Sequence, residues 1–176
     1  MRLLGPMAPL CLVVVHLAAA LAGPALAQTA ASAEKPPYRD DRTSAASVVR
    51  SYYNAIDRDE FARAWAYWQQ PPASTSFTSF ADGYDGAAST RVVLGTDRTE
   101  GAAGSLYHRI PVVIAATSDA GDTGIFAGCF TLRLADPTIQ EPPFQPLGIT
   151  AATLMPVPDG AATTLRDALP KTCDDS

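Results

Sequence analysis

After residue 43 the chain carries apolar residues at every third or fourth position, which is the spacing of one helix face. The first stripe consists of Val48, Val49, Tyr52, Tyr53 and Ile56. The second stripe consists of Phe61, Ala64, Trp65 and Trp68. Between the stripes Asp57 precedes Glu60 by three residues, a pattern typical of a helix start, and Pro71 ends the second stripe. The sequence therefore predicts two short amphipathic helices.

From about residue 90 the apolar period falls towards two, which indicates β-strands. Strands are expected at residues 90–97, 105–117, 124–135 and 147–157. The stretch 73–90, rich in Ser, Thr and Gly, is expected to form a third short helix or an ordered loop. Residues 119–122 have the composition of a hairpin turn. Pro111 lies inside a strand and is expected to need an edge position or a bulge, because proline donates no ladder hydrogen bond.

Helices followed by consecutive antiparallel strands predict the α+β fold class. We expect two to three N-terminal helices packed on a curved antiparallel sheet of about four strands, in one domain at residues 43–176. The length of 176 residues fits a single domain. The apolar fraction of 47% and the charged fraction of 18% are those of a globular protein.

The first 27 residues have the pattern of a cleaved signal peptide. Arg2 supplies a positive start, residues 10–21 are apolar, and Ala25 and Ala27 are small residues of the kind that signal peptidase requires. The alternative is a membrane anchor, but Gly23 and Pro24 interrupt a stretch already short for a span. We therefore expect a periplasmic or secreted protein with no membrane contact after cleavage, and a flexible linker at residues 28–42.

The charge balance argues against nucleic-acid partners. The chain carries a formal net charge of −5, and removal of residues 1–27 with Arg2 leaves 12 basic and 18 acidic residues. Lys35 and Lys171 are its only lysines. Nucleic-acid binding depends on clustered Lys and Arg that release counterions, so we expect no nucleic-acid partner.

Two cysteines, Cys129 and Cys173, follow the expected cleavage point. An oxidising compartment favours a disulfide between them, and a loop of this length would stabilise the fold by roughly 4 kcal/mol. The alternative is two unpaired thiols. Strand alternation places Cys129 on the face opposite Phe126 and Phe130, where a returning tail would meet it. One remaining histidine and two cysteines do not make a ligand set, so no metal site and no cofactor are expected.

The run Tyr52-Tyr53-Asn54-Ala55-Ile56, followed by Phe61, Ala64, Trp65 and Trp68, resembles the opening of the nuclear-transport-factor-2-like superfamily, which is also called SnoaL-like or the cystatin-like cone. The chain most resembles uncharacterised secreted bacterial members. The resemblance implies a cone-shaped pocket between helices and sheet. The superfamily includes isomerases, dehydratases, epoxide hydrolases and polyketide cyclases together with non-enzymatic modules, so the resemblance does not select a function.

No catalytic constellation is evident. None of the strands at 105–117, 124–135 and 147–157 contains an acidic residue, so no sheet carboxylate is available as a general base in an apolar pocket. His108 is a weak catalytic candidate, because it alternates in register with Ile110 towards an apolar face. The alternative is a hydrogen-bonded core or rim histidine, since no carboxylate partner is in view.

An aromatic pocket for an apolar or planar ligand is the main binding candidate. Its expected lining residues are Tyr53, Trp65, Trp68, Tyr84, His108, Phe126 and Phe130, with Ile110 and Met155 beside them. The alternative is a solid aromatic core without a pocket.

The sequence thus predicts an exported, non-catalytic domain that binds a small apolar molecule or a protein partner. A lyase or isomerase centred on His108 and a tyrosine is the second hypothesis. A homodimer that assembles through an open sheet is the third.

Overall fold

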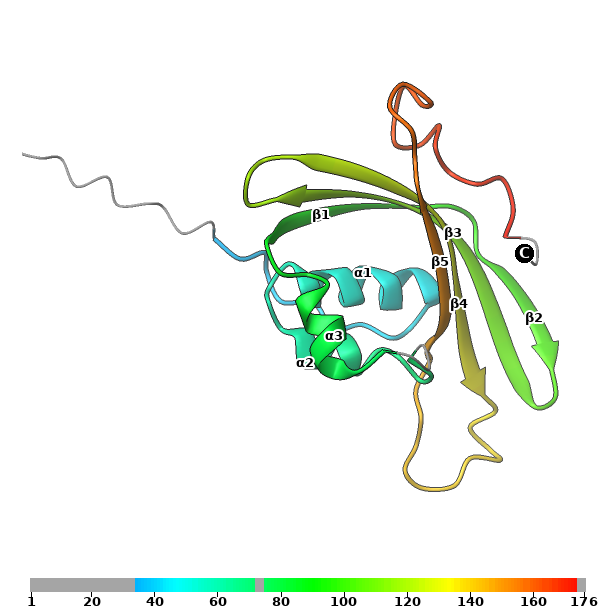
Figure 1. Ribbon diagram of the computed structural model, residues 1–176. Coiled ribbons are helices and arrows are strands. Elements are labelled where there is room, and N and C mark those ends of the chain that lie inside the picture. The colour runs from blue at the N-terminus through cyan, green and yellow to red at the C-terminus, as the bar shows by residue number, and fades with distance from the viewer. Residues whose placement is uncertain (1–33, 72–74, 174–176) are drawn as a thin grey trace, which may run out of the picture. The chain divides into compact units, whose positions relative to one another are not determined.

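The computed structural model describes residues 34–71 and 75–173. The expected signal peptide at residues 1–27 and the first part of the expected linker lie outside the described residues. The described part contains three helices and a five-stranded antiparallel sheet, which confirms the α+β class with the helices N-terminal to the sheet (Figure 1).

Helix α1 spans Ala45–Ile56 and buries the first predicted apolar stripe. Its N-cap is Ser44, whose hydroxyl oxygen accepts a hydrogen bond from the Ser47 backbone N–H at 3.1 Å. Such a cap satisfies a backbone donor that the helix itself leaves unpaired. Helix α3 spans Phe77–Asp82 and has an equivalent cap at Ser76. Of the two alternatives expected for the stretch 73–90, a short helix or an ordered loop, the short helix is present.

Helix α2 is shorter than predicted. It spans Phe61–Trp65, and Glu60 occupies its N-cap without a side-chain cap hydrogen bond. Asp57 is instead the C-cap of α1, so the expected capping pair does not form. Trp68 lies beyond the helix in a parallel bridge to Ile149, with backbone hydrogen bonds of 2.8 Å on either side of the bridge. The backbone N–H of Gln69 and the carbonyl of Tyr67 bond to Ile149, so the chain does not continue as a helix to Trp68.

The sheet has the order β1-β3-β4-β5, with β2 paired to β3 on the same side as β1. Its strands are β1 Ala87–Leu94, β2 Arg98–Ala102, β3 Ser105–Ser118, β4 Thr123–Ala135 and β5 Gly148–Pro156. The four predicted strands are present. Strand β2 was not predicted, because all five of its residues are exposed and no apolar alternation marks it.

Pro111 lies in neither an edge strand nor a bulge, contrary to the prediction. It sits in the middle of β3, which pairs with β4 along its whole length. On its other side β1 ends at Leu94 and β2 begins at Arg98, and Pro111 faces the interval between them. Its carbonyl accepts a hydrogen bond from the Gly95 backbone N–H at 2.8 Å. A residue without an N–H fits here because Pro111 lies outside the registers of both β1 and β2 with β3, so neither ladder loses a donor.

Residues 34–42, expected to be a flexible linker, make specific hydrogen bonds to α1. The Asn54 side-chain oxygen accepts from the Arg39 backbone N–H, and its nitrogen donates to the Pro37 carbonyl, both at 2.9 Å. The Asp41 backbone N–H donates to the Ser51 hydroxyl at 2.9 Å. Irregular backbone is thus fixed by side chains of the neighbouring helix, and these contacts have no periodic signature in the sequence.

The two faces of the sheet are covered by different parts of the chain. The helices pack on the inner face, where Ile110, Val112 and Phe130 join the main core. The segment after β5, here called the tail (residues 157–173), runs over the opposite, outer face (Figure 1). There the predicted Cys129–Cys173 disulfide is present, with a Cα–Cα distance of 5.8 Å. Val113 is fully buried although it does not belong to the helix-side core, which fits cover by the tail.

Candidate functional site

A group of aromatic side chains lies where the helices meet the sheet. Tyr52 is at its centre, with ring centroids 6.2 Å from Trp68, 6.4 Å from Phe80 and 6.2 Å from Phe130. Trp65 and Tyr84 extend the group, each with its ring centroid 5.2 Å from that of Phe80. We call the following set the aromatic cluster: Tyr52, Tyr53, Trp65, Trp68, Phe80, Tyr84 and Phe130.

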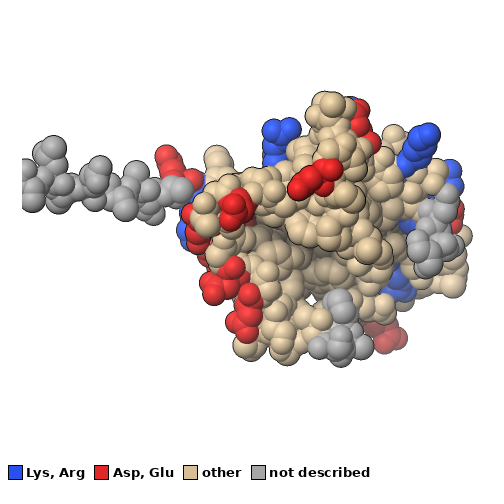
Figure 2. Space-filling model, turned by 45° about the horizontal axis from the view of Figure 1, so that its top comes forward, with Lys and Arg blue, Asp and Glu red and all other residues tan. Residues whose placement is uncertain are grey.

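The aromatic cluster extends from the core to the surface. Tyr52 and Phe130 are buried, whereas Trp65, Trp68 and Tyr84 are only partly buried. Beyond Trp65, at a centroid distance of 5.9 Å, Phe77 is 44% exposed. In the view of Figure 2 the middle of the molecule is hollowed and uncharged, while acidic side chains gather towards the left edge.

Two hydroxyl groups meet inside the cluster. The hydroxyl oxygens of Tyr52 and Tyr84 lie 2.6 Å apart. Burial raises the pKa of Tyr52 well above the ordinary tyrosine value and raises that of Tyr84 as well, so both phenols are protonated at neutral pH. Within the pair only one hydroxyl donates to the other. The second proton has no acceptor among the hydrogen bonds of the described residues.

Trp68 contributes a third polar hydrogen at the same place. Its indole N–H lies close enough to the Tyr52 hydroxyl to lower the pKa of Tyr52 slightly. It nevertheless makes no hydrogen bond of acceptable geometry with any described residue, although the nitrogen is buried. Buried donors are almost always satisfied, and an unsatisfied one costs about 1–3 kcal/mol. The aromatic cluster therefore offers unpaired donor capacity next to an apolar surface.

His108 has a carboxylate partner, contrary to the sequence interpretation. Its Nδ1 lies 2.8 Å from the Asp97 carboxylate and 3.1 Å from the Thr99 hydroxyl. The partner comes from the interval between β1 and β2, whereas the sequence predicted Asp97 as the last residue of a strand at 90–97. The His108 side chain is 16% exposed and that of Asp97 is 31% exposed. His108 has no hydrogen bond or ion pair to any member of the aromatic cluster within the described ranges.

The remaining predicted lining residues occupy separate places. Phe126 lies on the inner face of β4, four residues from Phe130, and is partly buried. Ile110 is buried in the main core. Met155 is wrong as a lining residue: it pairs with Ala127 on the outer face and is 65% exposed. The aromatic cluster thus gathers Tyr53, Trp65, Trp68, Tyr84 and Phe130, but not Phe126, His108 or Met155.

The outer face carries two adjoining cavities under the tail. One, of about 390 Å³, is lined by Cys129, Thr131, Thr153 and Met155 from the sheet. The other, of about 220 Å³, includes the cationic residues Arg98, Arg109 and Lys171. Arg109 also forms an ion pair with Glu100 at 3.6 Å. Three cationic side chains therefore lie at this end of an otherwise acidic chain, beside Asp97, which lines the same cavity.

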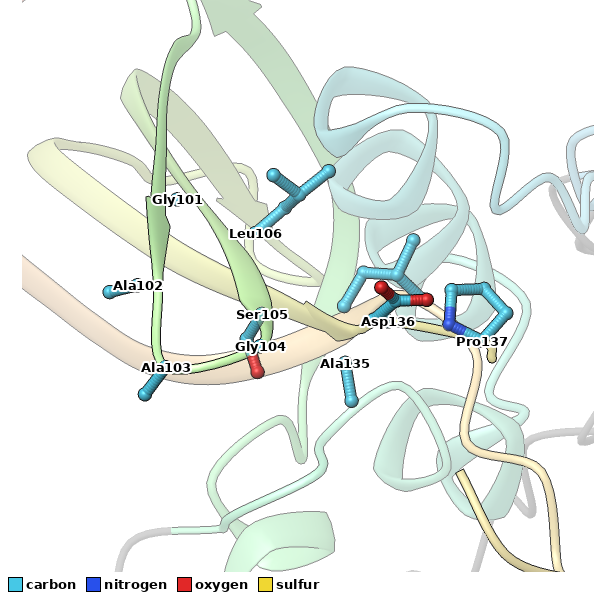
Figure 3. A pocket seen from close by; sticks show the side chains of 10 residues that line it. Gly101, Ala102, Ala103, Gly104, Ser105, Leu106, Ala135, Asp136 and Pro137 are labelled. Carbon is cyan, nitrogen blue, oxygen red and sulfur yellow. The ribbon is translucent and has the colours of Figure 1, made fainter. Parts of the chain in front are cut away.

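A further cavity of about 550 Å³ lies at the tip of the β2–β3 hairpin. Figure 3 shows the Leu106 side chain on one side of it and Asp136 and Pro137 on the other. The turn residues Ala103 and Gly104 both have positive φ, as a two-residue hairpin turn of type I′ requires. The cavity is mostly apolar, and Ser105 and Asp136 are the polar side chains that line it.

Within residues 34–71 and 75–173, no three His, Cys, Asp or Glu side chains gather closely enough to hold a metal ion. None of the helices in that part of the chain has the length and hydrophobicity of a membrane span.

Sequence reasoning found most of the aromatic cluster but missed its polar centre. The stripe spacing placed Tyr52 and Trp68 on apolar helix faces, but the Tyr52 hydroxyl meets that of Tyr84 only because of where the chain after α3 packs. Asp97 was missed because its role depends on β2, a strand without an apolar pattern. Comparison with models of known protein families, with curated proteins and with solved structures gives no match for this chain.

Proposed function

We propose that this chain is an exported, non-catalytic domain that binds a small apolar molecule carrying a carbonyl or hydroxyl oxygen. The observation that carries the proposal is the buried Trp68 indole N–H, which has no hydrogen-bond partner among the described residues and lies beside the Tyr52–Tyr84 hydroxyl pair. A ligand oxygen at this point would accept from the indole and from the second hydroxyl. Its apolar body would pack against Trp65 and Phe80.

The aromatic cluster should bind a hydrocarbon and a ketone of the same shape with different affinities. A hydrocarbon would gain only the burial of apolar surface, about 25 cal/mol per Å². A ketone of the same shape would also satisfy donors that are otherwise unpaired. Sites built to hydrogen-bond a ligand reject analogues that lack the polar atom, because the buried groups are then left without partners. The aromatic cluster should therefore prefer the oxygenated member of such a pair.

The test is a titration of intrinsic tryptophan fluorescence with 1-indanone and with indane, its hydrocarbon analogue. We expect the wild-type protein to bind the ketone about tenfold more tightly. Trp68→Phe keeps an aromatic ring but removes the donor, so it should abolish this preference. Trp65→Phe is the matched control, because it changes a ring of the same cluster without removing the unpaired donor, and it should leave the preference intact. Equal affinity of the wild type for both probes would refute the proposal.

A second candidate, proton abstraction by His108, is favoured by the Asp97 contact. A carboxylate at Nδ1 stabilises the tautomer that carries its proton there, which leaves Nε2 as a base. The reaction class would be removal of a proton next to a carbonyl group. The test is exchange of the α-protons of 1-indanone in D2O, followed by NMR. Exchange above the buffer rate that disappears in His108→Ala would support this function, and exchange at the buffer rate would exclude it for this probe.

We also propose export with cleavage after Ala27 and kinship with the nuclear-transport-factor-2-like superfamily. The Cys129–Cys173 disulfide supports export, because disulfides persist in oxidising compartments. Helices that precede an antiparallel sheet support the kinship at the level of architecture. The intact mass of protein recovered from the expressing cells tests the cleavage. A mass that includes residues 1–27 would contradict it.

A further inference from the structure

Strand β2 presents a free sheet edge. It pairs with β3 on one side, and on its other side the backbone groups of Thr99 and Gly101 have no partner among the described residues. The direction of these groups follows from the hairpin. Ala102 and Ser105 flank a two-residue turn and exchange hydrogen bonds, so Glu100 and Arg98 also bond to β3.

The alternate residues therefore point their backbone groups away from the sheet. Asp97, Thr99 and Gly101 direct their N–H and C=O groups outward, because hydrogen-bonded and non-bonded positions alternate along an antiparallel pair. All five residues of β2 are exposed. Such an edge is a template for another strand unless charges or bulges block it.

The charges on β2 indicate which strand fits. Arg98 lies directly opposite Arg109 in the register, a like-charge pair that is unfavourable across strands. Lys171 and Arg98 both line the smaller cavity under the tail. Arg98 has no ion pair with any residue that the structure describes. Two positions along, on the same face, Glu100 is largely exposed, although it also pairs with Arg109 of its own chain. The strand thus offers one unmatched positive and one exposed negative charge on one face.

We propose that a second copy of this chain pairs with β2 in antiparallel fashion, with the two-fold axis at Thr99. In this register Thr99 faces Thr99 of the second copy as a hydrogen-bonded pair. Arg98 then lies opposite Glu100 of the second copy, and Glu100 lies opposite its Arg98. Both ion pairs form on the outer face in non-hydrogen-bonded positions, where side chains approach most closely.

The register satisfies backbone and side chains together. Asp97 faces Gly101 of the second copy, so the outward groups of three residues on each strand are used and about six hydrogen bonds form. A register shifted by two residues would set Glu100 opposite Glu100 or Arg98 opposite Arg98. The edge is therefore self-complementary in one register, as a two-fold symmetric interface requires.

The predicted association is weak and reversible. A five-residue strand buries less than the roughly 1,200 Å² typical of stable interfaces, so we expect a dissociation constant in the micromolar range or above. The interface lies away from the aromatic cluster, and the inference does not depend on the proposed ligand. It joins the β2–β3 hairpins of the two copies, so the second copy would border the hairpin-tip cavity at Gly101.

Sedimentation of the full chain between about 10 µM and 1 mM tests the proposal. The wild type should shift from monomer to dimer across this range. Arg98→Glu and Glu100→Arg each place like charges opposite one another and should weaken self-association about tenfold. A mixture of these two variants has opposite charges at both positions and should associate at least as well as the wild type. A monomeric wild type, or a mixture that stays monomeric, would overturn the proposal.

A substitution that removes a backbone N–H without changing any charge tests the contribution of edge pairing by itself. Thr99→Pro removes an N–H that points away from β3, so the β2–β3 ladder keeps its hydrogen bonds while the outer edge loses a donor. Thr99→Val is the matched control, because it also removes the hydroxyl near His108 but keeps the N–H. We expect Thr99→Pro to remain monomeric and Thr99→Val to dimerise as the wild type does. Equal dimerisation of the two variants would contradict edge pairing.

Discussion

The two halves of the sheet show how far the surroundings of a strand decide its burial. Leu106 and Ile110 lie on the same face of β3, four residues apart, yet Leu106 is 46% exposed and Ile110 is 1% exposed. Ile110 belongs to the covered half, where the helices pack on the sheet. Leu106 belongs to the overhanging half, which consists of β2 with residues 105–109 and 133–135 and extends past the helices in Figure 1. An apolar alternation predicts a face, but only a packed neighbour turns that face into core.

The largest expected difference between the two halves is the effect of a side-chain truncation on the free energy of unfolding. Phe130→Ala should lower the free energy of unfolding by about 3–5 kcal/mol, because it leaves a cavity among fully buried side chains. Leu106→Ala in the overhanging half should cost less than about 1 kcal/mol, since the side chain is nearly half exposed. Urea denaturation of both variants measures the difference. Equal losses would show that the overhanging half is packed as well as the covered half.

The cover on the outer face can be tested through its covalent anchor. Replacement of Cys129 and Cys173 by serine releases a tail that is otherwise tied across a separation of 44 residues. The chain-entropy model gives a loss of up to roughly 4 kcal/mol in the free energy of unfolding. The matched control is the wild-type protein with a reductant, which should unfold at the same urea concentration as the double variant. Stability unchanged by both treatments would show that the disulfide does not constrain the unfolded chain.

The two halves also differ in the hydrogen bonding of one tyrosine hydroxyl in each. Tyr84→Phe removes the partner of the Tyr52 hydroxyl in the covered half and should cost about 1 kcal/mol. Tyr107→Phe removes a hydroxyl on β3 in the overhanging half that makes no hydrogen bond to any described residue, and should be neutral within about 0.5 kcal/mol. Thermal unfolding of both variants compares them. A cost for Tyr107→Phe as large as that for Tyr84→Phe would argue against the comparison.

The smallest effects come from two acids whose pKa values shift in opposite directions. Burial raises the pKa of Asp57 despite the Thr90 hydroxyl that donates to it, so its contribution to stability falls as pH rises above about 4. Asp57→Asn should therefore stabilise the protein at pH 7, by less than about 1 kcal/mol because solvent screens this half-buried group. The advantage should vanish at acid pH.

Asp136 at the end of β4 behaves in the opposite way. The Thr138 backbone N–H and hydroxyl donate to its carboxylate and lower its pKa, so the stability it contributes is present above about pH 4 and is lost as pH falls through the lowered value. Asp136→Asn should destabilise the protein at pH 7 but not at acid pH. Urea midpoints of the two variants from pH 3 to pH 7 should diverge with pH. Midpoints that shift in the same direction would contradict this assignment.

The parts of the fold that the sequence predicted are those with a repeating apolar pattern. Val48, Tyr52 and Ile56 mark one face of α1, and the alternation in β3 and β4 is equally clear. Strand β2 has no such pattern because both of its faces are exposed. Without a predicted β2, the contact between Asp97 and His108 could not be predicted either. The candidate site divides in the same way. Aromatic spacing predicted the rings, but the meeting of the Tyr52 and Tyr84 hydroxyls depends on how α3 folds back on α1.

Pro111 has a consequence for how the molecule opens. At this residue the edge beside β3 changes from β1 to β2, so the overhanging half is joined to the rest of the sheet mainly through β3 and β4, with one further pair between Arg133 and Gly148 of β5. Partial unfolding events release contiguous units that share few contacts with their surroundings. The amide hydrogens of β2 and of the adjoining end of β3 should therefore exchange with solvent through an opening that leaves α1 and Phe130 closed. On this view proline marks the boundary between two cooperative units within one continuous sheet.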